Sequence, residues 1–117
     1  MLNLSVVLFA IAALGGLTLA ILHFRNKNRP WPLSILHGLL AATALILLLI
    51  SVFGGGAAPT MGLKWAAGLF VVAALGGLTL FTFHLRNIRL SSPVVLIHGG
   101  VAVIAFLVLL SAAYMGK

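Results

Sequence analysis

The chain contains neither aspartate nor glutamate, and it contains no cysteine. Without side-chain carboxylates it cannot form the paired acids of general acid–base catalysis or the carboxylate relay of an ion or proton pump. Without a thiol it has no covalent cysteine nucleophile and no cysteine ligand for an iron–sulfur cluster. These absences exclude many common classes of site and direct attention to the four histidines.

Charge is scarce, because only 6% of the 117 residues are charged, whereas 63% are hydrophobic. A soluble domain of this length could not hide so much apolar surface from water. Four apolar stretches have the roughly 20 residues that a bilayer crossing needs. They run from Leu4 to Leu22, Leu33 to Phe53, Trp65 to Phe83 and Val94 to Tyr114. The sequence therefore predicts an all-α integral membrane protein, a four-helix bundle forming one membrane domain.

The seven cations are divided unevenly between the two ends of these stretches. Five lie in two connections on one side and two lie on the other: Arg25, Lys27, Arg29, Arg86 and Arg89 against Lys64 and Lys117. Because cytoplasmic loops carry an excess of lysine and arginine, we expect both connections to be cytoplasmic and both termini to be outside. The expected location is the plasma (inner) membrane, with the chain as a multi-pass protein.

The chain is a tandem repeat. The octapeptide AALGGLTL occurs at residues 12–19 and again at 73–80, an offset of 61 residues. Further identities at this offset are His23 with His84, Arg25 with Arg86, Asn26 with Asn87, Pro32 with Pro93, His37 with His98 and Gly38 with Gly99. We therefore expect two helical hairpins, residues 1–58 and 59–117. Since each hairpin crosses the membrane twice, a pseudo-twofold axis along the membrane normal should relate them.

Each repeat holds two histidines, His23 and His37 in the first and His84 and His98 in the second. Prolines and cations separate the two members of each pair, so these should lie on consecutive helices, near the same membrane face. A histidine inside a membrane is costly and suggests function, although one near the interface can be satisfied by water or a carbonyl.

Small residues occur at helical spacing from each histidine. Ala41 and Ala44 follow His37, Ala102 and Ala105 follow His98, and Gly16 and Gly77 precede His23 and His84. Such columns could accommodate a flat macrocycle. They are also what membrane helices use to approach one another closely, and either role suits the neighbouring Gly15 and Gly76.

Imidazole binds haem iron, zinc, copper and the magnesium of chlorophylls. Zinc and copper sites commonly add carboxylate or thiolate ligands, which this chain lacks, so we expect haem b with the four histidines as iron ligands. Haem also brings two propionates, which the arginines beside the histidines could bind, with the phosphate of anionic lipid as the alternative. These arginines are Arg25, Arg29, Arg86 and Arg89.

In architecture and ligand type the chain resembles the small four-helix, bis-histidine membrane cytochromes b. The resemblance implies an electron carrier between a quinone pool and a partner redox protein, rather than an enzyme by itself. One alternative is a non-catalytic accessory subunit of a larger respiratory or photosynthetic complex, with histidines that are structural or ligate a pigment or metal. A metal-ion binding or transport protein is another. Nothing in the chain suggests binding to nucleic acid.

The repeat restricts the haem count. One haem on the pseudo-twofold axis would use equivalent histidines, either His37 with His98 or His23 with His84. Two haems off the axis would use all four. Because small residues accompany every histidine, we expect two haems, with one as the alternative.

The other polar and aromatic residues suggest no separate function. Trp31 and Trp65 suit the two membrane interfaces. Ser34, Ser51 and Thr18 are expected to bond the backbone of their own helices.

The cation distribution generates the first testable prediction. Reporter fusions within residues 25–31 and 86–92 should report a cytoplasmic location, and fusions at either terminus should report the outside, because cations are retained on the cytoplasmic side. A cytoplasmic C-terminus would contradict this orientation.

Overall fold

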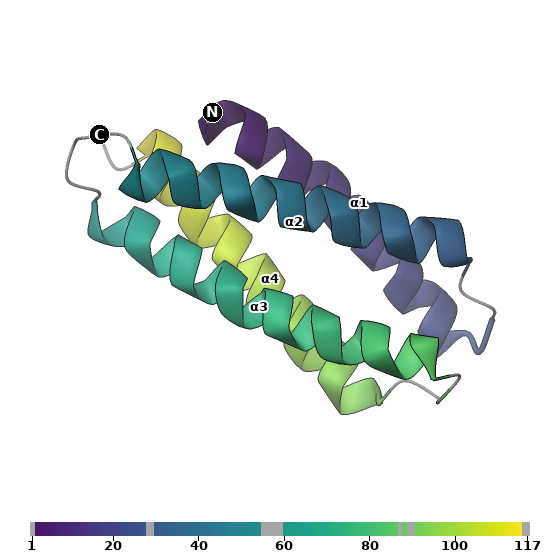
Figure 1. Cartoon of the computed structure of the whole chain (residues 1–117). Coiled ribbons are helices and arrows are strands. Elements are labelled where there is room, and N and C mark those ends of the chain that lie inside the picture. Colours follow the sequence, from purple (N-terminus) through teal and green to yellow (C-terminus); the bar gives the residue numbers. More distant parts are fainter. Residues whose placement is uncertain (1, 28–29, 55–59, 87, 89–90, 116–117) are drawn as a thin grey trace.

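The structure is a computed structural model that describes residues 2–27, 30–54, 60–86, 88 and 91–115, and its described part is helical with short connections (Figure 1). The helices are α1 (Leu2–Phe24), α2 (Trp31–Phe53), α3 (Met61–Leu85) and α4 (Ser92–Leu110), followed by a short π-helix, η1 (Ser111–Met115). Each helix is long and apolar enough to span a membrane. The predicted all-α, four-helix membrane class is confirmed, and every helix begins a few residues before the predicted stretch.

Local sequence explains where three of the helices begin. Pro32 and Pro93 lie in the first turns of α2 and α4, where the missing amide hydrogen would have no helical partner in any case. The Thr60 side chain caps α3 by accepting a hydrogen bond from the Leu63 amide at 3.3 Å. These starts lie close to the predicted ones because they depend on neighbouring residues alone.

The end of α1 is fixed by a left-handed residue, Asn26, which has a φ of 56°. The Asn26 amide donates to the His23 carbonyl at 3.1 Å, and the Lys27 amide donates to the Leu22 carbonyl at 2.9 Å. This pair of bonds is the Schellman arrangement, and asparagine tolerates the left-handed conformation better than most residues. The turn ends α1 one residue after His23.

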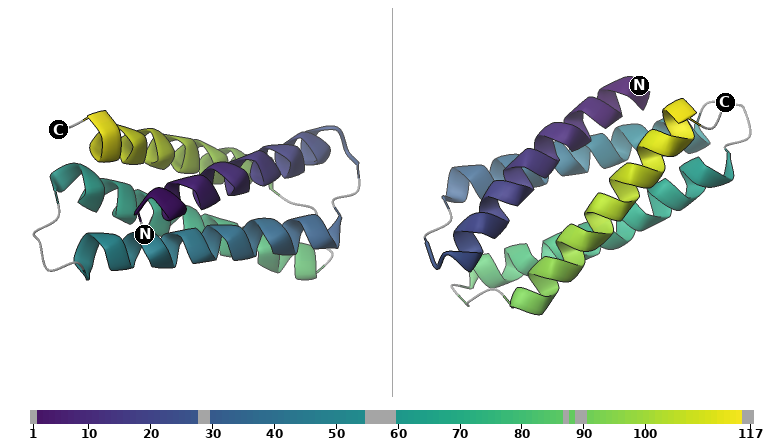
Figure 2. Two further views of the ribbon diagram at one scale, coloured as in Figure 1. Left: turned by 90° about the horizontal axis from the view of Figure 1, so that it is seen from above. Right: turned by 180° about the vertical axis from the view of Figure 1, so that it is seen from behind.

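The helices form two antiparallel hairpins, α1 with α2 and α3 with α4, in a bundle that measures 45 × 21 × 19 Å (Figure 1). Its length is close to the roughly 40–45 Å of a bilayer with its headgroups. Packing is more extensive within a hairpin than between hairpins, where α2 meets α3 and α1 meets α4. Both termini lie at one end, here called the terminal end (Figure 2). The α1–α2 and α3–α4 connections lie at the other, the loop end.

The closely packed core lies in the terminal half of the bundle. In the described part of the chain the buried residues there occur in pairs separated by 61 residues. These pairs are Ser5 and Ala66, Val6 and Ala67, Phe9 and Phe70, Ala12 and Ala73, Ala44 and Ala105, Leu48 and Leu109, and Val52 and Ala113. The repeat seen in the sequence is therefore also a repeat in burial.

Two contacts hold the core together. The rings of Phe9 and Phe70 stack with centroids 3.8 Å apart and planes 9° apart, which joins α1 of one hairpin to α3 of the other. Inside the first hairpin, the buried Ser5 hydroxyl donates to the Ala44 carbonyl at 2.8 Å. Since lipid gives helices no hydrophobic reason to associate, close packing and hydrogen bonds of this kind must supply the stability.

The stacked pair generates a prediction about stability. Phe9→Ala should lower the free energy of unfolding in detergent by about 3 kcal/mol, because it leaves a cavity between the hairpins. The matched control is Leu14→Ala on the same helix, where the side chain is 67% exposed and the expected change is small. Denaturant titration followed by circular dichroism measures both, and equal values for the two variants would refute this role for the stack.

Candidate functional site

His37 lies two turns inside α2 and points toward α1. Its Nδ1–H donates to the Ala12 carbonyl at 2.7 Å. The imidazole ring lies against the backbone of Gly16, where an added Cβ would be only 2.8 Å from the ring atom Cε1. We call Ala12, Gly16 and His37 the His37 cluster. Since Nδ1 carries the hydrogen, Nε2 carries the lone pair.

The second hairpin repeats this arrangement. The Nδ1–H of His98 donates to the Ala73 carbonyl at 2.7 Å. The ring lies against Gly77, where an added Cβ would be 3.1 Å from Cε1. We call Ala73, Gly77 and His98 the His98 cluster. Its residues lie 61 positions after those of the His37 cluster, so both hairpins present the same imidazole nitrogen.

The structure brings the two clusters together across the bundle. The ring centroids of His37 and His98 are 6.4 Å apart, and the ring planes are 85° apart. Their Nδ1 atoms are engaged by carbonyls, and Nε2 of neither ring has a hydrogen-bond partner among the described residues. The rings of His37 and His98, one from each hairpin, therefore lie close together inside the bundle.

His23 lies in the last turn of α1 and is buried, with 5% exposure. Its Nε2 is hydrogen-bonded to the Ser92 hydroxyl at 3.1 Å, and its ring meets Phe24 edge-on with centroids 4.9 Å apart. Because Ser92 begins α4, this contact joins the two hairpins at the loop end.

His84 makes the corresponding contact between α3 and α2. Its ring stacks on the Trp31 indole with centroids 3.8 Å apart and planes 20° apart. Its Nδ1 is hydrogen-bonded to the Ser34 hydroxyl at 3.3 Å. Trp31 also meets Phe81 edge-on at 5.9 Å. Trp31 and Ser34 therefore join the two hairpins. Their sequence positions gave no indication of this role.

The three hydroxyls expected inside helices, those of Thr18, Ser34 and Ser51, have different surroundings. The Thr18 hydroxyl donates to the Leu14 carbonyl of its own helix at 2.9 Å, as predicted. Ser34 Oγ is hydrogen-bonded to His84 Nδ1 on α3, a contact between helices that goes beyond the expected ability to bond its own backbone. Ser51 Oγ is buried without a hydrogen-bond partner in the described part of the chain.

The small residues near the histidines fall into two groups. Ala44 and Ala105 are 0% exposed and belong to the packed core. Ala41 and Ala102, one turn nearer the loop end, are only partly buried, as are Gly16 and Gly77. The bundle is therefore less tightly packed at the level of His37 and His98 than one turn deeper. Gly16 contacts His37, and Gly77 contacts His98, in each case across to the other helix of the same hairpin. Residue spacing along a single helix could not reveal these contacts.

The cations that the structure describes lie at the two ends of the bundle. Arg25, Lys27 and Arg86 are exposed at the loop end, and Lys64 is exposed near the terminal end. Arg29 and Arg89 lie outside the described residues. With no acidic side chain in the chain, any partner for these cations must come from lipid, a cofactor or another protein.

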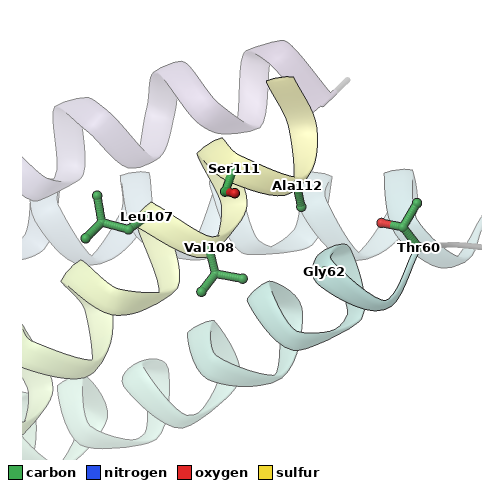
Figure 3. A pocket seen from close by; sticks show the side chains of 6 residues that line it. All are labelled: Thr60, Gly62, Leu107, Val108, Ser111 and Ala112. Atoms are coloured by element: carbon green, nitrogen blue, oxygen red, sulfur yellow. The ribbon is translucent and has the colours of Figure 1, made fainter. Parts of the chain in front are cut away.

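A pocket of about 440 Å³ lies at the opposite end of the bundle from the histidine pair (Figure 3). It is lined by Thr60, Gly62, Leu107, Val108, Ser111 and Ala112. Close packing of α3 against η1 borders it, because a Cβ added at Gly62 would be 2.8 Å from that of Ala112. Since it contains no histidine, this pocket is not part of the candidate site.

No protein-family model matches the chain, and no characterised protein or solved structure shows significant similarity to it. The described part of the chain is a bundle of four helices that are long and apolar enough to span a membrane, with the ring centroids of His37 and His98 6.4 Å apart.

The contacts at the loop end generate a prediction. Ser92→Ala should lower the free energy of unfolding by about 0.6 kcal/mol, the average for an interhelical hydrogen bond in a membrane protein. The matched control is Ser91→Ala, since the Ser91 side chain makes no capping bond. Equal unfolding curves for the two variants would show that the His23–Ser92 bond contributes nothing measurable.

Proposed function

We propose that the chain is a small membrane cytochrome b that carries electrons between a quinone pool and a partner redox protein. The observation that carries the proposal is the approach of His37 to His98 from separate hairpins, with ring centroids 6.4 Å apart. Both Nδ1 atoms donate to backbone carbonyls. This is the usual outer contact of a metal-ligating histidine, and it leaves Nε2 as the coordinating atom.

The centroid separation of 6.4 Å supports a metal shared by the two rings. An imidazole nitrogen binds a metal at about 2 Å, so two opposed imidazoles have ring centroids about 6 Å apart. We infer that the hairpins are related by a pseudo-twofold axis along the membrane normal and that a single site lies on it. This arrangement is the one-haem alternative, and it is better supported than the two-haem arrangement that the sequence favoured.

Two protein ligands fit haem better than a bare metal ion. In the described part of the chain no group of three or more potential metal-ligating side chains occurs, whereas structural and catalytic zinc sites usually use three or four. A haem supplies four nitrogens of its own and needs only axial ligands from the protein. Partial burial of Ala41 and Ala102 leaves this level of the bundle less filled than the core.

The charges at the loop end fit the same proposal. Arg25 and Arg86 lie at the end nearer the histidine pair, where guanidinium groups could bind the propionates of haem. Arg29 and Arg89 would add to this set, although they lie outside the described residues. Phosphates of anionic lipid are the competing partners.

Ligation by two histidines also limits the chemistry. When bound, haem b supplies a reversible one-electron change at iron. His37 and His98 would both bind the iron, so oxygen or a substrate would have to displace a histidine to reach it. The chain's residues would therefore support electron transfer and not catalysis at the metal. A quinone is a suitable partner because it is soluble in the membrane.

A second function remains supported by the same contacts. The His37–Ala12 and His98–Ala73 bonds also join the two helices of each hairpin, and His23 and His84 join the hairpins to each other. The histidines could therefore be structural in a non-catalytic accessory subunit of a larger complex, or could hold a pigment. A metal-ion binding or transport protein is the remaining alternative.

A reduced-minus-oxidised absorption spectrum of the purified protein tests the proposal. We expect the sharp α and Soret bands of six-coordinate low-spin haem, with one haem per chain. His37→Ala and His98→Ala should each lose haem or become high-spin, because each leaves an open iron position. His23→Ala and His84→Ala are the matched controls and should keep the spectrum. A featureless spectrum would refute the proposal, far-red bands would indicate a pigment, and two haems lost by all four variants would restore the two-haem arrangement.

A further inference from the structure

The acceptor carbonyls of the two clusters lie in the middle of helices, as does the Ala44 carbonyl that accepts from the small Ser5 hydroxyl. Each carbonyl inside an α-helix already accepts a bond from the amide four residues later. The side chain at that later position leans back over the preceding turn and normally covers the carbonyl. Four residues after Ala12 the chain has Gly16, which has no side chain. The Ala12 carbonyl is therefore open to a second donor, the imidazole of His37.

The space that a side chain at Gly16 would need is occupied by the His37 ring. A Cβ there would be 2.8 Å from Cε1 of His37 and 3.4 Å from both Nδ1 and Nε2. Carbon atoms in contact are ordinarily about 3.5–4.0 Å apart, so the ring would have to move. Since Nδ1 is held by the Ala12 carbonyl at 2.7 Å, movement of the ring must strain or break that bond.

The second hairpin has the same arrangement with slightly more room. Gly77 is four residues after Ala73, whose carbonyl accepts from His98 at 2.7 Å. A Cβ at Gly77 would be 3.1 Å from Cε1 and 3.7 Å from each ring nitrogen. An alanine should therefore displace His98 less than it displaces His37.

We propose that Gly16 and Gly77 are positioning residues for the two iron ligands. Each exposes the carbonyl that fixes the hydrogen on Nδ1, and each lets the ring lie flat against the first helix of its hairpin, so that Nε2 is the nitrogen available to a metal. This inference rests on the proposed haem function, because a ligand role for the histidines gives the orientation its purpose.

The chain provides matched controls. Gly38 and Gly99 directly follow His37 and His98 on the same helices, and a Cβ added at either meets no atom within 4 Å apart from its chain neighbours and its own helix backbone. Gly38→Ala therefore makes the same chemical change as Gly16→Ala in the same hairpin, at a position that does not face the ring, because consecutive helix positions do not face each other.

The first measurement needs no haem. The full chain is labelled with ¹⁵N-histidine in lipid nanodiscs, and the tautomer of each ring is read from its two nitrogen shifts. We expect His37 to carry its hydrogen on Nδ1 in the wild type and in Gly38→Ala. In Gly16→Ala this signal should move toward mixed tautomers or lose its strong hydrogen bond. Unchanged His37 signals in Gly16→Ala would overturn the proposal.

The second measurement is titration with haem. Loss of an outer contact to a metal ligand typically lowers affinity by about tenfold to a hundredfold, so Gly16→Ala should bind haem at least tenfold more weakly than Gly38→Ala. Equal affinities would overturn the positioning role alone. If the wild type binds no haem, the proposed function is refuted, and so is the role of His37 and His98 as iron ligands. That result would be obtained before any variant is compared.

Gly16→Ala could fail because the protein does not fold, and two further variants cover that outcome. Gly77→Ala is the milder change and should alter His98 while the His37 signals persist. In a His37→Ala background the ring is absent, so Gly16→Ala should no longer lower the thermal unfolding midpoint. An equal loss with and without the ring would show that the glycine does not act through His37 and would overturn the proposal.

Discussion

A polar ring inside an apolar bundle must find a hydrogen-bond partner, and in this chain that partner is a backbone carbonyl. The core around the histidines offers no carboxylate, because the chain has none. A bulky imidazole can reach a mid-helix carbonyl where the residue one turn later has no side chain in its way. The AALGG segments provide this in both hairpins, since their first alanine supplies the carbonyl and their last glycine leaves room for the ring. The orientation of the deeper histidine of each hairpin therefore depends on its AALGG segment.

Much of the fold could be predicted because it depends on composition and local sequence. Hydropathy located all four helices, and each begins within a few residues of its predicted start. The offset of 61 residues also predicted which positions would correspond. It could not show which helix faces meet. Gly16 was assigned by its spacing from His23 on α1, whereas it contacts His37 on α2.

The candidate site was predicted in part for the same reason. All four histidines were selected because such residues are rare in membranes, but their surroundings divide them into two kinds. His37 and His98 contact backbone within their own hairpins, whereas His23 and His84 contact side chains of the other hairpin. Trp31 and Ser34 were given only interfacial and backbone roles, because a stack between distant helices leaves no local signal. The only local sign that Ser34 could contact a histidine was its position one turn before His37 on the same helix.

The pairing of equivalent residues has a consequence for how such a chain could have arisen. Phe9 meets Phe70 and His37 meets His98, so these two contacts between the hairpins are each made by a residue and its own copy. Two identical hairpins, encoded once and associating as a homodimer, could make both contacts. Fusion into a single chain removes the need for identical halves and allows the copies to diverge. Divergence is visible at the loop end, where Trp31 stacks on one histidine while Ser92, its counterpart, hydrogen-bonds the other. The loop end thus has two chemically different sides, next to a centre in which equivalent residues meet.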